Sequence, residues 1–154
     1  MNTRFGWMLS AALLASPAAH AVLGGDIASV LDDRARVKGI RLEAATAPLQ
    51  VRTHSITLSD GSIIREFVSP AGVVFAVTWS TRLKPDLSAL LGAHAATYAA
   101  ATRDAMQTVP GIRRQFALRR GDLVVQSVGH LNSFVGKAYL RSLVPSGVDV
   151  DALH

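Results

Sequence analysis

The chain has 154 residues, a formal net charge of +5 and no cysteine. This length is that of one ordinary domain, and the lack of cysteine excludes disulfides, thiolate metal sites, cysteine nucleophiles and lipid attachment through an N-terminal cysteine. The charge is mildly basic, but no run of like charges is long enough to form a nucleic-acid-binding arm, so we expect no nucleic-acid partner.

The start of the chain is typical of a secretory signal peptide. Arg4 supplies a positive charge, an uncharged apolar run follows, and Ala19-His20-Ala21 places small residues where signal peptidase requires them. An uncleaved anchor is disfavoured because a spanning helix needs about 20 mainly apolar residues and polar residues interrupt this run. We predict cleavage between Ala21 and Val22, which divides the chain into a signal peptide (1–21) and one periplasmic or secreted domain (22–154) without a transmembrane segment.

The first part of the mature chain predicts a short helix and a connector. Residues 24–39 carry apolar side chains at helical spacing, and Asp26 can accept from the unpaired backbone N–H groups at the helix start. Residues 40–49 are rich in alanine and contain Pro48, so we interpret them as a connector.

The next segment predicts a meander of three antiparallel strands over residues 51–58, 63–69 and 73–80. Asp60-Gly61 is a strong hairpin signal, and Ser69-Pro70-Ala71-Gly72 predicts the second turn.

The third predicted strand is apolar on both faces, which is typical of a strand inside a sheet that is covered on both sides. The first two strands carry Arg52, His54, Arg65 and Glu66 among their apolar residues, so we expect them to be half solvated.

One main helical segment and a second strand pair complete the prediction. Pro85 and Asp86 suit a helix start, Pro110-Gly111 ends it, and Gly92 is expected to bend or split it. A stripe of apolar side chains at helical spacing would lie on the meander. Strands are predicted over 113–119 and 123–129, followed by 133–143 as part strand and part loop. The predicted fold is therefore α+β: an antiparallel meander sheet of about five strands, packed by the 86–109 helical segment, with a short N-terminal helix.

Five blocks, spread over the whole mature chain, resemble the exported bacterial family catalogued as domain of unknown function 2844, found mainly in proteobacteria. The resemblance implies a small periplasmic or secreted domain, and it implies no catalytic residues. The blocks are LGGD (23–26), SPAGVVFAVTW (69–79), PDLSALLG (85–92), GDLVVQSVGH (121–130) and AYLRSLVPSGV (138–148).

Catalytic patterns are sparse. Ser69 or Ser127 could serve as a nucleophile with His130 and Asp122, but no G-x-S-x-G elbow is present. Strand alternation would also place Ser127 and His130 on opposite faces.

Metal and phosphate patterns are equally sparse. Four histidines of the mature chain lack the spacing of a metal motif, and both common glycine-rich phosphate loops are absent, so we predict no metal and no cofactor. The histidines in question are His54, His94, His130 and His154.

Asp122, His130, Asn132 and Tyr139 form a candidate surface site at the end of a predicted strand, where loops often present functional groups. The structural alternative is that His130 or Asn132 caps backbone groups of a turn and that Tyr139 belongs to the core.

We therefore expect a non-enzymatic accessory or binding module of the cell envelope. One alternative is an envelope hydrolase with an unorthodox site near Asp122, His130 and Tyr139. Another is weak binding of acidic envelope polymers through an arginine-rich surface. That surface would comprise Arg113, Arg114, Arg119 and Arg120.

Overall fold

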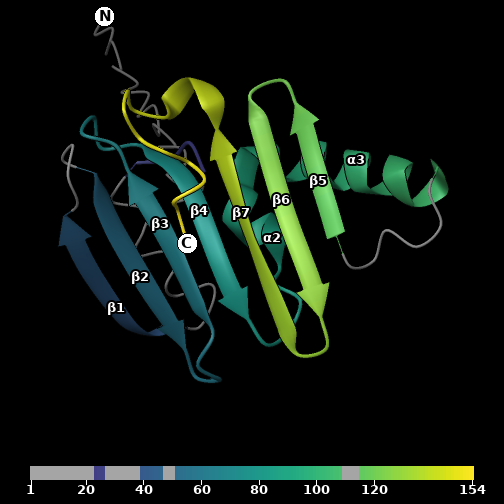
Figure 1. The fold of residues 1–154 in the computed structure, drawn as a ribbon, viewed down its shortest axis with the longest axis horizontal. Helices are drawn as coiled ribbons and strands as arrows, with labels where there is room; N and C mark the ends of the chain where they lie inside the picture. The colour runs from purple at the N-terminus through teal and green to yellow at the C-terminus, as the bar shows by residue number, and fades with distance from the viewer. Residues whose placement is uncertain (1–22, 27–38, 47–50, 109–114) are drawn as a thin grey trace, which may run out of the picture.

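The computed structural model describes residues 23–26, 39–46, 51–108 and 115–154. Nearly all of these residues belong to one antiparallel sheet, to the helices on one of its faces or to a tail on the other (Figure 1). The predicted signal peptide and most of the predicted N-terminal helix lie outside the described residues.

In the described residues the sheet has seven strands rather than the predicted number of about five. Their order is β1-β2-β3-β4-β7-β6-β5, and all neighbouring pairs are antiparallel. Two meanders, β1 to β4 and β5 to β7, are joined where β4 pairs with β7. The bounds are β1 (Gly39–Thr46), β2 (Arg52–Leu58), β3 (Ile63–Val68), β4 (Val74–Thr81), β5 (Gln115–Arg120), β6 (Leu123–His130) and β7 (Ser133–Leu140).

The two additional strands come from segments that were not predicted as full strands. Residues 40–49 were expected to form a connector, but residues 39–46 form the edge strand β1, which pairs with β2. Ser133–Leu140, expected to be part strand and part loop, is one continuous strand, β7, between β4 and β6. Residues 40–44 alternate apolar and polar side chains, a strand signal that the alanine content of the segment obscured, and in both segments the neighbouring strands supply the backbone hydrogen bonds.

The central position predicted for the apolar strand is confirmed. β4 lies in the middle of the sheet, and seven of its eight residues are buried. Phe75, Val77 and Trp79 are each at most 2% exposed, so this strand forms core rather than an open cleft.

The predicted helical segment covers one face of the sheet, with α2 (Leu87–Leu91), the 3-10 helix η3 (Gly92–His94) and α3 (Ala95–Thr108) (Figure 1). Asp86 caps α2 by accepting from the backbone N–H of Ser88 at 2.9 Å. Gly92 ends α2 at a positive φ of 42°, so the predicted split at this glycine is confirmed.

Between the helices and the sheet lies the larger of two cores, which we call the helix-side core. Tyr98 of α3 packs edge-on against Phe116 of β5, with ring centroids 5.5 Å apart. The helix-side core includes Ile56, Ile64, Val77, Trp79, Leu87, Leu90, Leu91, Val125 and Ala138.

Glu66 corrects the expectation that β3 is half solvated. Its carboxylate is completely buried on the helix side of the sheet, where Glu66 pairs in register with His54 of β2 and Val77 of β4. Burial, and second the nearby Arg52 charge, lower the pKa of His54. Two polar side chains at this point therefore face the core, not solvent.

The second core lies on the opposite face, which we call the open face. Residues 144–154, which we call the tail, run across this face in front of the sheet (Figure 1). Val148, Val150 and Leu153 of the tail pack on a cluster formed by Val51, Phe67, Phe75, Ala76, Val124 and Tyr139. The tail covers only part of the open face and leaves the rest of the face to form the candidate site.

Candidate functional site

The strand register arranges the side chains of the open face in three rows that run across the strands. The first row is apolar and carries Phe67, Ala76, Tyr139 and Val124 on four adjacent strands. All four are buried, and the tail packs on them. This row is therefore part of the second core.

The second row is polar and contains two cations. Arg65 of β3 faces Thr78 of β4, Thr78 faces Lys137 of β7, and Lys137 faces Gln126 of β6. Because adjacent strands lie about 4.8 Å apart, the Cα atoms of Arg65 and Lys137 are separated by about 10 Å. Thr78 lies between them, so two positive charges flank one hydroxyl group.

The third row is the uncovered part of the face. It carries Ile63, Ser80, Val135 and Val128, again on adjacent strands. Val128 and Val135 oppose each other and are 51% and 49% exposed, whereas most valines of the sheet are buried. A pair of half-exposed apolar side chains thus adjoins the polar row.

The second and third rows and the end of the tail line a groove of about 450 Å³. Its size is within the range of small-molecule sites, which hold about 300–1,000 Å³. Its side chains come from four strands and from the tail: Arg65, Thr78, Ser80, Gln126, Val128, Val135, Lys137, Leu153 and His154.

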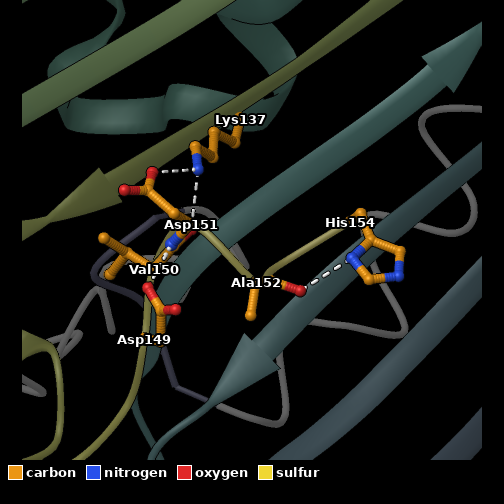
Figure 2. Close-up of polar contacts among 6 residues, drawn as sticks. All are labelled: Lys137, Asp149, Val150, Asp151, Ala152 and His154. Carbon is orange, nitrogen blue, oxygen red and sulfur yellow. Dashed lines mark hydrogen bonds and ion pairs between the residues drawn. The ribbon is translucent and has the colours of Figure 1, made fainter.

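Lys137 fastens the tail at the edge of the groove (Figure 2). Its Nζ donates to the backbone carbonyl of Val150 at 2.7 Å and to the Asp151 carboxylate at 2.8 Å. The Lys137 side chain is mostly buried, while that of Asp151 is exposed. The Lys137 hydrogen bond and charge lower the pKa of Asp151.

Local hydrogen bonds shape the rest of the tail. The Asp149 carboxylate accepts from the backbone N–H of Asp151 at 2.8 Å, and the His154 ring nitrogen Nδ1 lies 2.7 Å from the carbonyl of Ala152 (Figure 2). The backbone N–H of Ala152 also donates to the Asp149 carbonyl at 3.3 Å, and Leu153 and His154, which follow this turn, line the groove.

Arg65 is the groove's second cation. Among the described residues no carboxylate forms an ion pair with it, in contrast to Lys137. Its guanidinium group has five N–H donors in a planar arrangement that suits a carboxylate or a phosphate.

The four residues of the predicted surface site do not come together. Asp122 precedes β6 and His130 ends it, so eight residues of extended strand separate them by about 26 Å. Asn132 is in the exposed β6–β7 turn with a positive φ of 55°, and Tyr139 is buried beneath the tail. The arrangement gives no support to a hydrolase site built from these side chains.

Asp122 instead holds a turn. Its two carboxylate oxygens accept from the backbone N–H of Ser142 at 2.8 Å and from the Ser142 hydroxyl at 2.6 Å, which caps the 3-10 helix η4 (Arg141–Leu143). The Ser142 side chain is the main cause of the lowered pKa of Asp122. The local role is structural.

The other predicted groups are also dispersed. Ser69 is buried, and its hydroxyl accepts from the backbone N–H of Val73 at 3.3 Å. In the part of the chain that the structure describes, no three His, Asp or Glu side chains lie close enough to share a metal ion. On β5, Arg119 is exposed and Arg120 lies 3.5 Å from Asp104, while Arg113 and Arg114 lie outside the described residues.

A second hollow, of about 240 Å³, lies between the β2–β3 turn and the start of α2. Its two carboxylates are already engaged in their own turns. Asp60 accepts from the N–H and hydroxyl of Ser62, both at 2.9 Å, and Asp86 caps α2. We therefore regard the groove on the open face as the better site.

Sequence reasoning did not identify the groove residues Arg65, Thr78, Lys137 and the valine pair. Arg65 and Lys137 are separated by 72 positions in the sequence, and only the β4–β7 pairing brings their strands into one sheet. No local pattern in 123–129 or 133–140 marks this face, because apolar and polar residues are mixed on both faces of the two strands.

Comparisons with known proteins bear on the family. No helix of the described residues has the length and apolar character needed to cross a membrane. Neither the search of curated proteins nor that of solved structures found a match. The model of a family described as "Protein of unknown function (DUF2844)" matches residues 19–153, which confirms the resemblance stated from the sequence blocks: the chain belongs to this family.

Proposed function

We propose that this protein is a non-enzymatic binding module of the cell envelope that holds a small ligand in the groove of its open face. The observation that carries the proposal is the groove itself, about 450 Å³ between the tail and the Val128–Val135 pair. The signal-like start of the chain supports an envelope location.

The groove has the composition of a binding site. Apolar side chains supply contact area, and a few polar groups, chiefly Arg65 and Thr78, would fix the orientation of a ligand. The groove is built on four adjacent strands of one hydrogen-bonded sheet, so its side chains are held by a rigid frame.

A groove-filling variant tests the proposal. The purified protein would be titrated by NMR with probes of different classes, namely dodecanoate, glucose and indole, and the backbone amides of the open face would be followed. We expect at least one probe to shift the amides of Thr78, Val128 and Val135. That response should disappear in Val135→Trp and persist in Met106→Trp, a matched control on the exposed side of α3.

Two results would reject the proposal. One is a set of probe responses that avoids the open face or survives Val135→Trp. The other is turnover of envelope glycans or lipids by the purified protein, since a binding module does not release product.

A further inference from the structure

We infer that the groove takes an anionic amphiphile, a molecule with one carboxylate or phosphate group on a hydrocarbon chain. This inference rests on the proposed function and adds the chemical class of the ligand. It follows from three features of the open face: the positive charge of the second row, the apolar side chains of the third row and the way in which the tail binds to this face.

The charge of the groove selects an anion. Arg65 and Lys137 flank Thr78 in one row, and no acidic residue belongs to the groove lining. Lys137 is paired with Asp151 of the tail, so Arg65 is the cation that can meet a ligand. A head group above Thr78 would accept from its hydroxyl and from the Arg65 guanidinium. Hydrogen bonds in which the donor or the acceptor is ionised are about twice as strong as neutral ones.

The tail shows that this row binds a carboxylate. Asp151 places its Oδ1 2.8 Å from the Nζ of Lys137 (Figure 2). Val150 and Leu153 beside it pack on the apolar cluster of the open face. An acid group with adjoining apolar groups is thus the chemistry already bound at one end of the row. Arg65 offers an equivalent cation at the other end.

The third row selects a hydrocarbon. Val128 and Val135 are half exposed next to the polar row, and Leu153 of the tail lines the groove as well. A chain lying on these side chains would remove their apolar surface from water.

The sheet disfavours a peptide as the occupant. The backbone groups of β4, β7 and β6 are consumed by pairing with their neighbours, so the face offers side chains only. An extended peptide lying there would lose water from amide groups that find few partners, which costs free energy, whereas a hydrocarbon chain has no such groups.

The test compares probes that carry the anionic group, the hydrocarbon chain or both. Dodecanoate and dodecyl phosphate carry both features, dodecyltrimethylammonium carries the chain with the opposite charge, and acetate and inorganic phosphate carry the anion alone. Binding would be measured by NMR below the micelle concentration of each amphiphile, with the amides of Thr78, Val128 and Val135 as reporters.

We expect the two anionic amphiphiles to bind in the groove, and the cationic amphiphile and the free anions to bind at least about tenfold more weakly, because each lacks one of the two contacts. Arg65→Gln should weaken dodecanoate binding by about tenfold or more, and Arg65→Lys should restore part of it. Arg103→Gln on α3 removes the same charge away from the open face and should have no effect. Thermal unfolding of each variant would confirm that it is folded.

The outcomes separate this inference from the proposed function. If dodecanoate and dodecyltrimethylammonium bind equally, or if Arg65→Gln behaves like Arg103→Gln, the anionic class is rejected. If glucose or indole binds in the groove and dodecanoate does not, the proposed function stands and the amphiphile inference falls. If none of the probes shifts the groove amides, both are overturned.

Discussion

Replacing Gly136 by alanine tests the packing that joins the two meanders of the sheet. Gly136 of β7 pairs with Trp79 of β4 on one side and with Ser127 of β6 on the other. A Cβ atom at this position would lie 2.4 Å from the backbone oxygen of Gln126 and 2.4 Å from Cζ2 of the Trp79 indole. Carbon atoms prefer separations of about 3.5–4.0 Å, so the methyl group is about 1 Å too close on two sides.

The cost can be estimated from these two contacts. Overpacking a core costs about 1–3 kcal/mol, and we take about 3 kcal/mol because one of the two neighbours is backbone that cannot rotate away. Alanine also lowers the entropy of the unfolded chain, which returns up to about 1 kcal/mol. The net loss in the free energy of unfolding is about 2 kcal/mol. With a urea m-value of about 1.5 kcal/mol/M, the unfolding midpoint should fall by about 1.3 M.

Urea unfolding followed by far-UV circular dichroism measures this change, and Trp79→Phe provides the control. Phenylalanine lacks the indole atoms that clash, and Nε1 of Trp79 has no hydrogen-bond partner among the described residues, so no bond is lost with it. Gly136→Ala should therefore cost less in the Trp79→Phe background than in the parent, although the contact with the Gln126 oxygen remains. A midpoint within about 0.3 M of the parent in Gly136→Ala alone would refute the packing argument.

Three further predictions concern the groups that hold the tail and η4. Asp122→Ala should lower the free energy of unfolding by about 1 kcal/mol, as for the loss of a helix cap. Ser142→Ala should lower it by less, because the bond from the Ser142 backbone N–H to Asp122 remains. Urea unfolding of both variants measures this change, and an unchanged Asp122→Ala midpoint would contradict the capping role. Lys137→Met should speed hydrogen exchange at the amides of Asp151 and Ala152 with little change in the helices, whereas equal exchange in both proteins would show that Lys137 does not hold the tail. The pKa values of Asp122 and Asp151 are lowered in the folded state. The stabilisation by these carboxylates is therefore present above the ordinary pKa of about 3.9 and is lost as the pH falls through the lower folded values. NMR titration should find the pKa of both carboxyls below the ordinary value, and an ordinary pKa for either would contradict its hydrogen bonds.

Local chemistry explains which parts of the fold could be predicted. The turns at Asp60-Gly61 and Ser69–Gly72 depend on residues that tolerate their backbone angles, and the helix start at Asp86 depends on a side-chain oxygen. The apolar residues on both faces of β4 predict a buried strand without any knowledge of which strands pair with it. Each of these signals is contained within a few neighbouring residues.

The parts that were missed depend on contacts between distant segments. The first part of β1 alternates apolar and polar residues over 40–44, but the alanines and Pro48 that follow favoured a connector, and the strand is completed by its pairing with β2. Glu66 looked solvated because its charge suggests exposure, yet the register with Val77 places it on the buried face. The groove requires both the β4–β7 pairing and the path of the tail, and neither leaves a local sequence signal.

The tail competes with any anion for Lys137, which leads to a prediction of opposite sign to Arg65→Gln. In the free protein the Asp151 carboxylate occupies Lys137, so a ligand head group meets one available cation, at Arg65, and one occupied cation. A protein that must first give up an internal contact binds its ligand with an affinity reduced by the fraction of the competent state.

Asp151→Asn removes the competing charge while it keeps the size of the side chain and the bond from Lys137 to the Val150 carbonyl. We expect this variant to bind dodecanoate several-fold more tightly in the same NMR titration, and Asp149→Asn, which leaves Lys137 occupied, to bind like the parent. Weaker binding by Asp151→Asn would mean that Asp151 acts by holding the tail as a wall of the groove, and the competition argument would be rejected.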